Sequence, residues 1–499
     1  MSKNIILCSD GTGNTTVKGR GTNVFRLFEA IDLNGHRTDP ALSPQVAFYD
    51  DGVGTERAKP VKAVAGATGL GLARSVRQLY QELARVYDPG DRLFFFGFSR
   101  GAFTIRTLVD FIARCGIVDV QRVPTARRFE RLVDEAYATY RRCYRTRLQQ
   151  WLGWPVDAGA SLRFRQTHCR PGEVSIAFVG VWDTVDAVGL PFHASDFVNL
   201  TIHRFKFPDY HLSPTVERAA QALAIDDSRH SFHPRLWHLR QGDEARIEQV
   251  WFAGAHSNVG GGYPKPGLSL VALEWMMQRA EAAGLRLLAS DRAYFTDHAN
   301  VDDELYDPRA GAGVLYRWRP RDLEALCRRN QVTPTIHLSV LERIAHGTDG
   351  YAPGNLPPGS RVVITPTGDP DRDAAAAERA HGVEAVLHQA HAARESLLRR
   401  VETELHIGGL SYYVFVSSLG VGLLAGLVWG VAALLVILLP GLALAQMLSA
   451  WADRRMRDAF SGFWFGVQGE LRRALKRARH AAALRRASTP APVRVLSRD

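Results

Sequence analysis

The chain contains little cysteine. It has five in 499 residues, widely separated and with no Cys-x-x-Cys pair: Cys8, Cys115, Cys143, Cys169 and Cys327. An odd number of scattered cysteines argues against a disulfide scaffold or a zinc module and favours a reducing compartment. The first residues, MSKNIILCSDG, also lack the charged and then apolar pattern of a secretory signal, because their apolar run covers only residues 5–7. We therefore expect the chain to start in the cytoplasm.

Charge is missing altogether from one long stretch. Residues 408–452 contain no Asp, Glu, Lys, Arg or His. About 20 apolar residues cross a bilayer, so this stretch is long enough for two passes, or for one pass and an interfacial segment. Basic residues flank it on both sides, and such flanks stay in the cytoplasm. We predict a transmembrane hairpin in the bacterial inner membrane, with a turn near residues 426–430 and a cytoplasmic catalytic domain and tail. The alternative is a buried helical hairpin of a soluble protein.

The remaining composition is that of a folded protein with a basic end. Hydrophobic residues make up 46% of the chain and charged residues 23%, which excludes a wholly disordered chain. The formal net charge is +11, and residues 453–499 carry most of it, with 12 Lys/Arg against 4 Asp/Glu. Aromatic residues at 460–465 and the basic helix after them suit the surface of an anionic membrane. A basic run could also bind nucleic acid, but its place beside the apolar stretch favours lipid headgroups.

These features divide the chain into four parts. Residues 1–360 form the body, in which residues 120–172 are interpreted as a cap insertion or as a solvated helical excursion. Residues 361–407 are read as a linker and helical connector, because a Pro/Gly-rich stretch precedes an Ala-, Glu- and Arg-rich one. Residues 408–452 are the transmembrane segment, and residues 453–499 are a basic, partly amphipathic tail.

Within the body, short apolar runs alternate with helical patterns. Apolar strands without polar alternation, separated by helices, predict an α/β fold with a mostly parallel sheet and helices on both faces. The predicted strands are Ile5–Cys8, Val46–Tyr49, Leu93–Phe96, Ser175–Val181 and Gln249–Ala253, and the predicted helices are Leu72–Tyr87, Ala102–Cys115 and Leu268–Ala283. In such sheets, sites form beyond the carboxyl ends of the strands.

The third predicted strand runs directly into a nucleophile motif. Residues 97–102 read GFSRGA, which is G-x-S-x-G between a strand and a helix. The two glycines let the strand turn sharply into the helix and leave the Ser99 hydroxyl exposed above the sheet. The amide of Arg100, at the helix N-terminus, can stabilise an oxyanion. We therefore predict that Ser99 is a nucleophile.

A nucleophilic serine needs a base that is oriented by an acid. In hydrolases of this kind the order along the chain is serine, acid, histidine. His256 follows the strand at residues 249–253 and precedes a glycine-rich loop, so we predict it as the base. The acid is open between Asp183, which follows the strand at residues 175–181 and is favoured, and Asp226.

Glycine-containing turns follow the first two strands. An amide of Gly11 or Thr12 could be the second oxyanion donor, although an ordinary Asx turn explains the same residues equally well. Asp10 and Asn14 after the first strand, and Asp51 after the second, are candidates for binding substrate at the same edge of the sheet.

Together these segments resemble a known family. The motifs ILCSDGTGNT, YDDGVGT, FFFGFSRGA, VGVWDTV, VWFAGAHSNVGGGY and SVLERIAHG occur in the order seen in an uncharacterised α/β-hydrolase family, domain of unknown function 2235. That family includes phospholipase effectors of type VI secretion. The resemblance covers residues 3–360 and implies an α/β-hydrolase core, Ser99 as nucleophile, His256 as base and hydrolysis of lipid acyl esters.

The sequence thus predicts a membrane-associated serine hydrolase that cleaves acyl esters, with membrane lipids or a small ester as substrate, no nucleic-acid partner and no cofactor or metal. Two alternatives remain. One is a metal-dependent phosphoesterase in which Asp10, Asp51, Asp183 and His256 hold Mg²⁺ or Mn²⁺. The other is a non-catalytic membrane adaptor that uses the fold as a binding platform.

Overall fold

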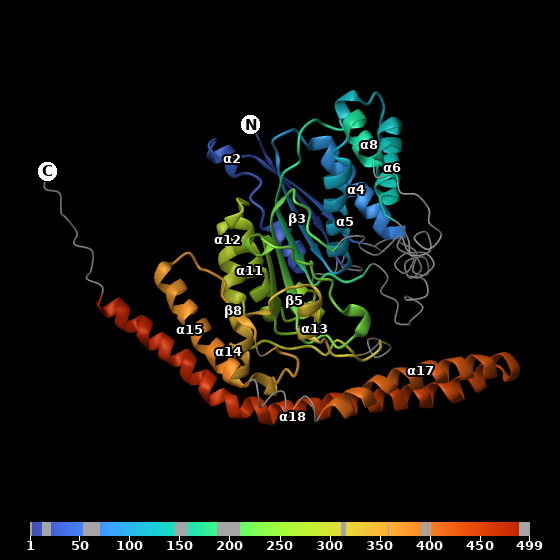
Figure 1. Ribbon diagram of the computed structural model, residues 1–499, viewed down its shortest axis with the longest axis vertical. Helices are drawn as coiled ribbons and strands as arrows, with labels where there is room; N and C mark the ends of the chain where they lie inside the picture. The colour runs from blue at the N-terminus through green and yellow to red at the C-terminus, as the bar shows by residue number, and fades with distance from the viewer. Residues whose placement is uncertain are drawn as a thin grey trace.

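The computed structural model describes residues 2–11, 21–52, 70–144, 157, 159–186, 210–310, 316–357, 359–390, 397 and 401–488. Within these residues, eight parallel strands form one sheet in the order β2-β1-β3-β4-β5-β6-β7-β8 (Figure 1). The strands are β1 (Asn4–Ser9), β2 (Gln45–Asp50), β3 (Arg92–Phe98), β4 (Ile176–Trp182), β5 (Val216–Ala224), β6 (Ile247–Phe252), β7 (Thr335–His337) and β8 (Arg361–Val363).

Helices connect the strands and continue beyond the sheet. Their bounds are α1 (Asn23–Glu29), α2 (Gly35–Thr38), α4 (Leu70–Val86), α5 (Arg100–Cys115), α6 (Ala126–Arg142), α8 (Ala160–His168), α10 (His256–Gly260), α11 (Gly267–Ala282), α12 (Ala289–His298), α13 (Leu323–Arg329), α14 (Leu338–His346), α15 (Pro370–Gln389), α17 (Glu402–Trp429) and α18 (Val431–Ser488). Short 3₁₀ turns lie at Val120–Arg122, His230–Phe232, Asp243–Ala245 and Thr348–Gly350.

The side chains of each inner strand alternate between two apolar cores. In β1, Ile5 and Leu7 pack into the core formed with α4, α5, α6 and α8, whereas Ile6 and Cys8 pack into the core formed with α1 and α11. All four side chains are fully buried. Because both faces of the sheet are covered, its strands read as uninterrupted apolar runs. The predicted α/β fold is confirmed, and all five predicted strands and all three predicted helices are present within a few residues of their expected bounds.

Strand β5 is the main element that the pattern does not predict. Its sequence is VERAAQALA, and alanine is depleted in strands because it offers little surface for packing against cross-strand neighbours. Here it lies between β4 and β6, where small side chains are buried beneath the covering helices. Burial between neighbouring strands, and not intrinsic strand propensity, therefore makes this segment a strand. The sheet also extends past the predicted end of the body at residue 360. Strand β8 lies in the segment expected to be a linker, and it pairs with β7 of the body.

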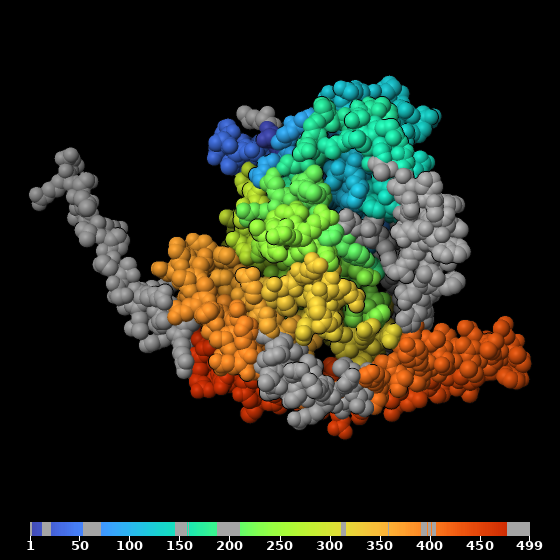
Figure 2. Space-filling model, in the orientation of Figure 1, coloured from blue at the N-terminus to red at the C-terminus, as the bar shows by residue number. Residues whose placement is uncertain are grey.

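The expected transmembrane segment forms a helical hairpin. Helix α17 ends at Trp429, Gly430 adopts a φ of 82°, and α18 begins at Val431, so the turn falls in the predicted place. The hairpin extends beyond the α/β body (Figures 1 and 2). Two segments of it, residues 406–429 and 431–476, are long and apolar enough to cross a membrane by length and composition.

The tail differs from the expectation that its aromatic residues face a membrane. Helix α18 continues without a break under the body, where Phe460 and Trp464 are buried in a third core with residues of α14 and α15. The indole of Trp464 donates a hydrogen bond to the carbonyl of Pro353 over 2.8 Å. Phe465, in contrast, is 78% exposed. The first part of the tail is therefore docked on the body.

The segment interpreted as a cap insertion is only partly described. Its helices α6 and α8 pack on α4 and α5 and extend the core on that face of the sheet. An isolated antiparallel β-bridge pairs the backbones of Val118 and Cys169 and joins the two ends of this segment just beyond the end of α5. Residues 145–156 and 158 lie outside the described part of the chain, and a covering role for them stays a prediction.

Candidate active site

The turn between β3 and α5 has the geometry of a nucleophile elbow. Ser99 occupies it with φ 59° and ψ −121°, a backbone conformation that non-glycine residues adopt only when the surrounding structure enforces it. A Cβ at residue 101 would lie 2.1 Å from the carbonyl oxygen of Ser9, and one at residue 97 would lie 2.7 Å from the Cα of Ala102. Gly101 thus lets the turn pack against the end of β1, and Gly97 lets β3 pass close to the first turn of α5.

Ser99 lies at the point where the strand order reverses. The chain leaves β1 to form β2 on one side and returns to form β3 on the other, and ligands bind at such switch points in open α/β sheets. The backbone N–H of Ser99 donates to the carbonyl of Trp182 over 3.1 Å, and the N–H of Val185 donates to the carbonyl of Ser99 over 3.4 Å. These bonds fix the turn beside the end of β4, where Asp183 follows.

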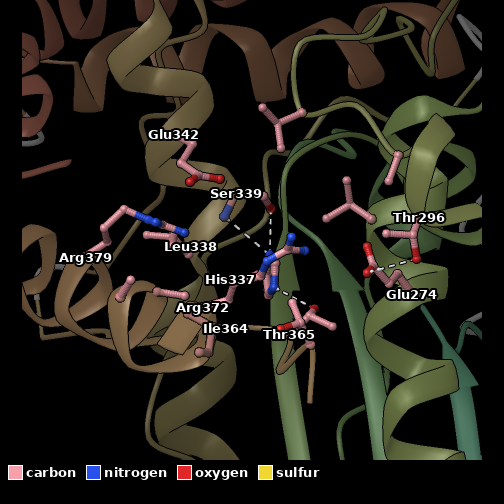
Figure 3. Close-up of a pocket in the computed structure, with 16 residues that line it drawn as sticks. Glu274, Thr296, His337, Leu338, Ser339, Glu342, Ile364, Thr365, Arg372 and Arg379 are labelled. Atoms are coloured by element: carbon pink, nitrogen blue, oxygen red, sulfur yellow. Dashed lines mark hydrogen bonds between the residues drawn. The ribbon is translucent and has the colours of Figure 1, made fainter. Parts of the chain in front are cut away.

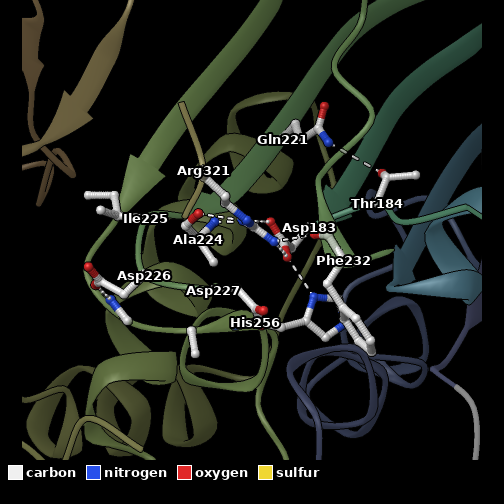
Figure 4. Close-up of polar contacts among 12 residues, drawn as sticks. Asp183, Thr184, Gln221, Ala224, Ile225, Asp226, Asp227, Phe232, His256 and Arg321 are labelled. Carbon is white, nitrogen blue, oxygen red and sulfur yellow. Dashed lines mark hydrogen bonds and ion pairs between the residues drawn. The ribbon is translucent and has the colours of Figure 1, made fainter. Parts of the chain in front are cut away.

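His256 and Asp183 are joined by a hydrogen bond. The imidazole Nδ1 lies 2.5 Å from Asp183 Oδ2, and both side chains are buried (Figure 4). The rings of Phe98 and Phe232 pack against the imidazole, with centroids 4.6 and 5.1 Å away. Because Phe98 directly precedes Ser99, this contact brings the elbow against His256. The imidazole Nε2 has no hydrogen-bond partner among the residues described.

The carboxylate of Asp183 is also held by an arginine that the sequence did not indicate. Arg321 donates to its Oδ1 over 2.7 Å and to its Oδ2 over 2.8 Å, and the amide of Ala224 donates to Oδ1 over 3.1 Å. Figure 4 shows Arg321 and His256 converging on this carboxylate from different sides. Every oxygen of Asp183 is therefore directed by a specific donor.

The surroundings of Asp183 and His256 favour an ionised carboxylate and a neutral imidazole. Burial alone would raise the pKa of Asp183, but the charge of Arg321 and the hydrogen bond from His256 hold it well below its usual range. Burial lowers the pKa of His256 below its ordinary value, although the bond to Asp183 acts in the opposite direction. At neutral pH the site therefore holds an ionised carboxylate beside a neutral imidazole.

Asp226, the rival acid, has other partners. Its Oδ2 accepts hydrogen bonds from the amide of Gly254 over 2.6 Å and from the hydroxyl of Tyr351 over 2.8 Å. In Figure 4 its side chain points away from His256. Burial raises the pKa of Asp226 to about 6. The structure brings Asp183 to the imidazole and places Asp226 in a neighbouring loop.

The neighbouring Asp227 supports His256 through the backbone. Its Oδ2 accepts a hydrogen bond from the backbone N–H of His256 over 3.2 Å and a second bond from Arg229 over 2.6 Å. Burial would raise the pKa of Asp227, but its bonds with Arg229 lower it. Sequence reasoning missed this residue, because it follows the candidate acid directly and carries no separate motif.

Asp10, at the end of β1, is engaged by its own chain. Its carboxylate accepts from the hydroxyls of Thr22 over 2.5 Å and Tyr49 over 2.6 Å, and from the amide of Gly11 over 2.6 Å. The amide of Gly11 is therefore committed to Asp10 in this structure. Two further candidates, Thr12 and Asn14, lie outside the described residues. Asp51 follows β2 at the same edge and is half-buried.

A separate cavity of about 670 Å³ lies among α11, α12, α14, α15 and the end of β8 (Figure 3). His337 and Ser339 line it, and His337 Nδ1 lies 2.8 Å from the hydroxyl of Ser339. His337 also caps α14 by accepting from the backbone N–H of Ser339, while its Nε2 lies 3.1 Å from the hydroxyl of Thr365. Burial lowers the pKa of His337 to about 3. Hydroxyls occupy both ring nitrogens, so this pair is a helix cap.

The donor geometry gives no support to the metal hypothesis. Among the described residues, no three or more His, Cys, Asp or Glu side chains gather in a way that could hold a metal ion. Arg321 donates to both oxygens of Asp183, and a guanidinium in that position opposes a cation there.

Comparisons with known proteins place the body in a family. Residues 3–279, more than half of the chain, match the family model for the catalytic domain of Tle1-like phospholipase effectors of type VI secretion. An uncharacterised protein of Saccharomyces cerevisiae is 27% identical over 243 residues, which are 46% of this chain and 32% of that protein. The chain therefore matches only about a third of the length of that relative.

Two solved structures show weak likeness. An uncharacterised protein from Pseudomonas aeruginosa is 20% identical, with a TM-score of 0.33 and coverage of 79% of this chain and 60% of the other. A Tle1 effector bound to the VgrG spike of the type VI secretion system is 18% identical, with a TM-score of 0.30 and coverage of 53% and 52%. Both scores are low, so the assignment rests on the family model. By that match, this chain belongs to the family of type VI secretion phospholipase effectors with a Tle1-like catalytic domain.

Proposed function

We propose that this protein is a membrane-associated serine hydrolase that cleaves acyl esters of phospholipids, with Ser99 as nucleophile, His256 as base and Asp183 as orienting acid. The observation that carries the proposal is the union of a strained serine elbow with a buried His256–Asp183 pair at the same edge of the sheet. Membership of a phospholipase effector family supports a lipid substrate.

In the proposed reaction, the Oγ of Ser99 attacks the ester carbonyl carbon while His256 Nε2 takes the hydroxyl proton. The tetrahedral intermediate collapses, the bond to the alcohol breaks, and His256 returns the proton to the departing alkoxide. Water then attacks the acyl-enzyme by the same route and releases the fatty acid. The unpartnered Nε2 suits this shuttle, because it faces no competing group among the described residues.

The first turn of α5 is the proposed oxyanion site. The amide of Arg100 lies at the N-terminus of α5, where the first N–H groups of a helix point outward along its axis. Together with the helix dipole it can stabilise negative charge on the carbonyl oxygen. Because Gly11 already donates to Asp10, Thr12 remains the second proposed donor. Asp10, Asn14 and Asp51 remain proposed as substrate-binding residues.

We further propose that the hairpin of α17 and α18 spans a bilayer. Large apolar side chains cover its surface, among them Leu427 at 84% and Trp429 at 73% exposure. An exposed apolar surface of this extent marks a membrane or protein contact. Residues 406–429 form 24 residues of helix, or about 36 Å at 1.5 Å per residue, against about 30 Å of hydrocarbon. Basic flanks on both sides favour a cytoplasmic location for both ends of the hairpin.

Replacing members of the triad tests the mechanism. We expect Ser99→Ala and Asp183→Asn each to lower kcat by about 10⁴-fold, the usual loss for triad members. Asp226→Asn, a matched change in the rival acid, should keep activity within a few fold, because Asp226 does not orient the base. The measurement is mass-spectrometric detection of fatty acid and lysophospholipid released from mixed lipid vesicles by the purified full chain. Equal product from wild type and Ser99→Ala would refute the mechanism.

A further inference from the structure

Arg321 stands out among the buried charged residues. Its side chain has no solvent exposure, and its guanidinium donates two parallel hydrogen bonds to the two oxygens of Asp183. The same guanidinium donates to the carbonyls of Ala224 and Phe232. Asn355 fastens the backbone of Arg321 by donating to its carbonyl over 3.1 Å. Such a planar, bidentate pairing fixes the orientation of the carboxylate as well as its charge.

We propose that Arg321 is a positioning residue for ester hydrolysis, which aims the carboxylate of Asp183 at His256 and, by neutralising it, sets the pH range in which His256 acts as base. The inference rests on the proposed roles of Ser99, His256 and Asp183. In this role Arg321 acts through Asp183.

One carboxylate oxygen of Asp183 contacts both Arg321 and His256. Asp183 Oδ2 accepts from Arg321 over 2.8 Å and lies 2.5 Å from His256 Nδ1. The other oxygen accepts from Arg321 and from the amide of Ala224. Rotation of the carboxylate about its own axis would break several of these bonds at once. The direction of the Nδ1 bond, and with it the orientation of the imidazole ring, is therefore set by the guanidinium.

Charge around the imidazole is balanced in two pairs. Asp183 meets Arg321 over 2.7 Å, and Asp227, which accepts from the backbone N–H of His256, meets Arg229 over 2.6 Å. Each carboxylate near His256 thus has its own arginine. A doubly protonated imidazole gains little from carboxylates that are already paired, so burial dominates and His256 stays neutral.

Two further titratable groups lie close to Arg321. Burial lowers the pKa of His233 to about 3, so its ring is neutral over the working range. Burial raises the pKa of Asp226 to about 6, and this carboxyl is bonded to Gly254 and Tyr351. Neither supplies a positive charge that could replace Arg321 beside Asp183.

The segment that carries Arg321 also links the site to the hairpin. Tyr316 packs on Phe232 with ring centroids 5.3 Å apart, and Phe232 packs on His256. Two residues further on, the fully buried Trp318 lies against the base of α17, where a Cβ at residue 408 would be 2.1 Å from its ring. Residues 316–321, which we name the strap, therefore contact both the catalytic pair and the membrane hairpin.

The test compares Arg321→Gln with Arg321→Lys in the full chain, using a soluble short-chain ester in detergent. Without the guanidinium, Asp183 is unneutralised and the Asp183–His256 pair takes up its proton at higher pH. In the pH profile of kcat/KM, we expect Arg321→Gln to shift the acidic limb upward by about one pH unit. The same variant should lower the plateau value of kcat/KM about 10²-fold. Arg321→Lys keeps the charge without the fork, so the limb should stay in place while the plateau falls.

Arg343→Gln is the matched control. Arg343 is as deeply buried as Arg321, but it donates to the carbonyls of Val301 and Asp303, away from the pair. It should leave the acidic limb unchanged. An Arg321→Gln variant with a wild-type limb and plateau would overturn the inference, while Ser99→Ala reports separately on the proposed mechanism.

Folding of the variant provides a second readout. Should Arg321→Gln fail to fold, the expected cause is an unpaired buried carboxylate. Adding Asp183→Asn removes that charge and should restore a cooperative thermal transition followed by circular dichroism. A double variant that remains unfolded would refute the pairing.

Discussion

Helix α18 is one continuous helix with two different halves. In the half that follows the turn, apolar side chains such as Val436 and Met447 are 72% and 66% exposed. In the half that runs under the body, Phe460 and Trp464 are 1% exposed and Leu471 is fully buried. Both halves contain large apolar side chains, but these are exposed in the first half and buried against the body in the second.

The spacing of the apolar residues separates the two halves. In the docked half, the buried positions 460, 464, 471 and 475 recur at helical intervals and form one face against α14 and α15. In the first half, residues 431–451 are apolar on nearly every side. A helix with one apolar stripe is suited to a protein surface, whereas a helix that is apolar all round is suited to a core or a membrane. Periodicity, more than apolar content, therefore decides what each half contacts.

The largest effect should come from the docked half. Trp464→Ala removes a buried indole together with its bond to Pro353 and should lower the free energy of unfolding by about 3–5 kcal/mol. The adjacent Phe465→Ala is the matched control, and because Phe465 is exposed we expect a change within about 0.5 kcal/mol. Guanidinium unfolding of the full chain in detergent measures both. Equal losses from the two variants would mean that this half is not docked.

The first half should respond to charge. Leu439→Arg places a cation near the middle of an apolar arm, at a cost of about 2.5–3.5 kcal/mol for insertion. We expect the fraction of protein that resists carbonate extraction from membranes to fall sharply. Leu162→Arg, at a comparably exposed position of α8 in the body, should leave that fraction unchanged. Unchanged extraction of Leu439→Arg would contradict a spanning hairpin.

The same contrast shows what the sequence could predict. The strands with both faces buried were evident as apolar runs, and the elbow was evident because Gly97, Ser99 and Gly101 are neighbours in the chain. Asp183 and His256 followed from the rule that sites lie at strand ends. The docked half of α18 was misjudged, because aromatic and basic residues beside an apolar stretch match a membrane surface as well as they match a one-sided protein contact.

The arginine that holds Asp183 could not be predicted. Arg321 lies 138 positions from Asp183 along the chain, within a segment that has no motif, and it is one of 62 basic residues. Only the fold of the strap, residues 316–321, places Arg321 beside the carboxylate of Asp183. Strand β5 was missed for a related reason, since its alanines become strand-forming only between β4 and β6.

The smallest effect should appear where the two parts of the molecule meet. Gly408 begins the apolar stretch, and a side chain there would lie 2.1 Å from Trp318 and 2.9 Å from the Cβ of Ala452. Gly408→Val should displace Trp318 and, through the strap, shift Arg321. We expect kcat on a soluble ester to fall about tenfold, because small misplacements of catalytic groups are costly.

Gly409→Val separates this effect from a general change in α17. Gly409 has the same helical setting but open space around it, because a Cβ at this position would have nothing within 4 Å. It should keep wild-type activity on the soluble ester. Since that ester needs no bilayer, a loss confined to Gly408→Val would show that the base of the hairpin acts directly on the Asp183–His256 pair. Equal activity of the two variants would instead mean that the strap absorbs the displacement, and that the hairpin and the site are joined in space but independent in function.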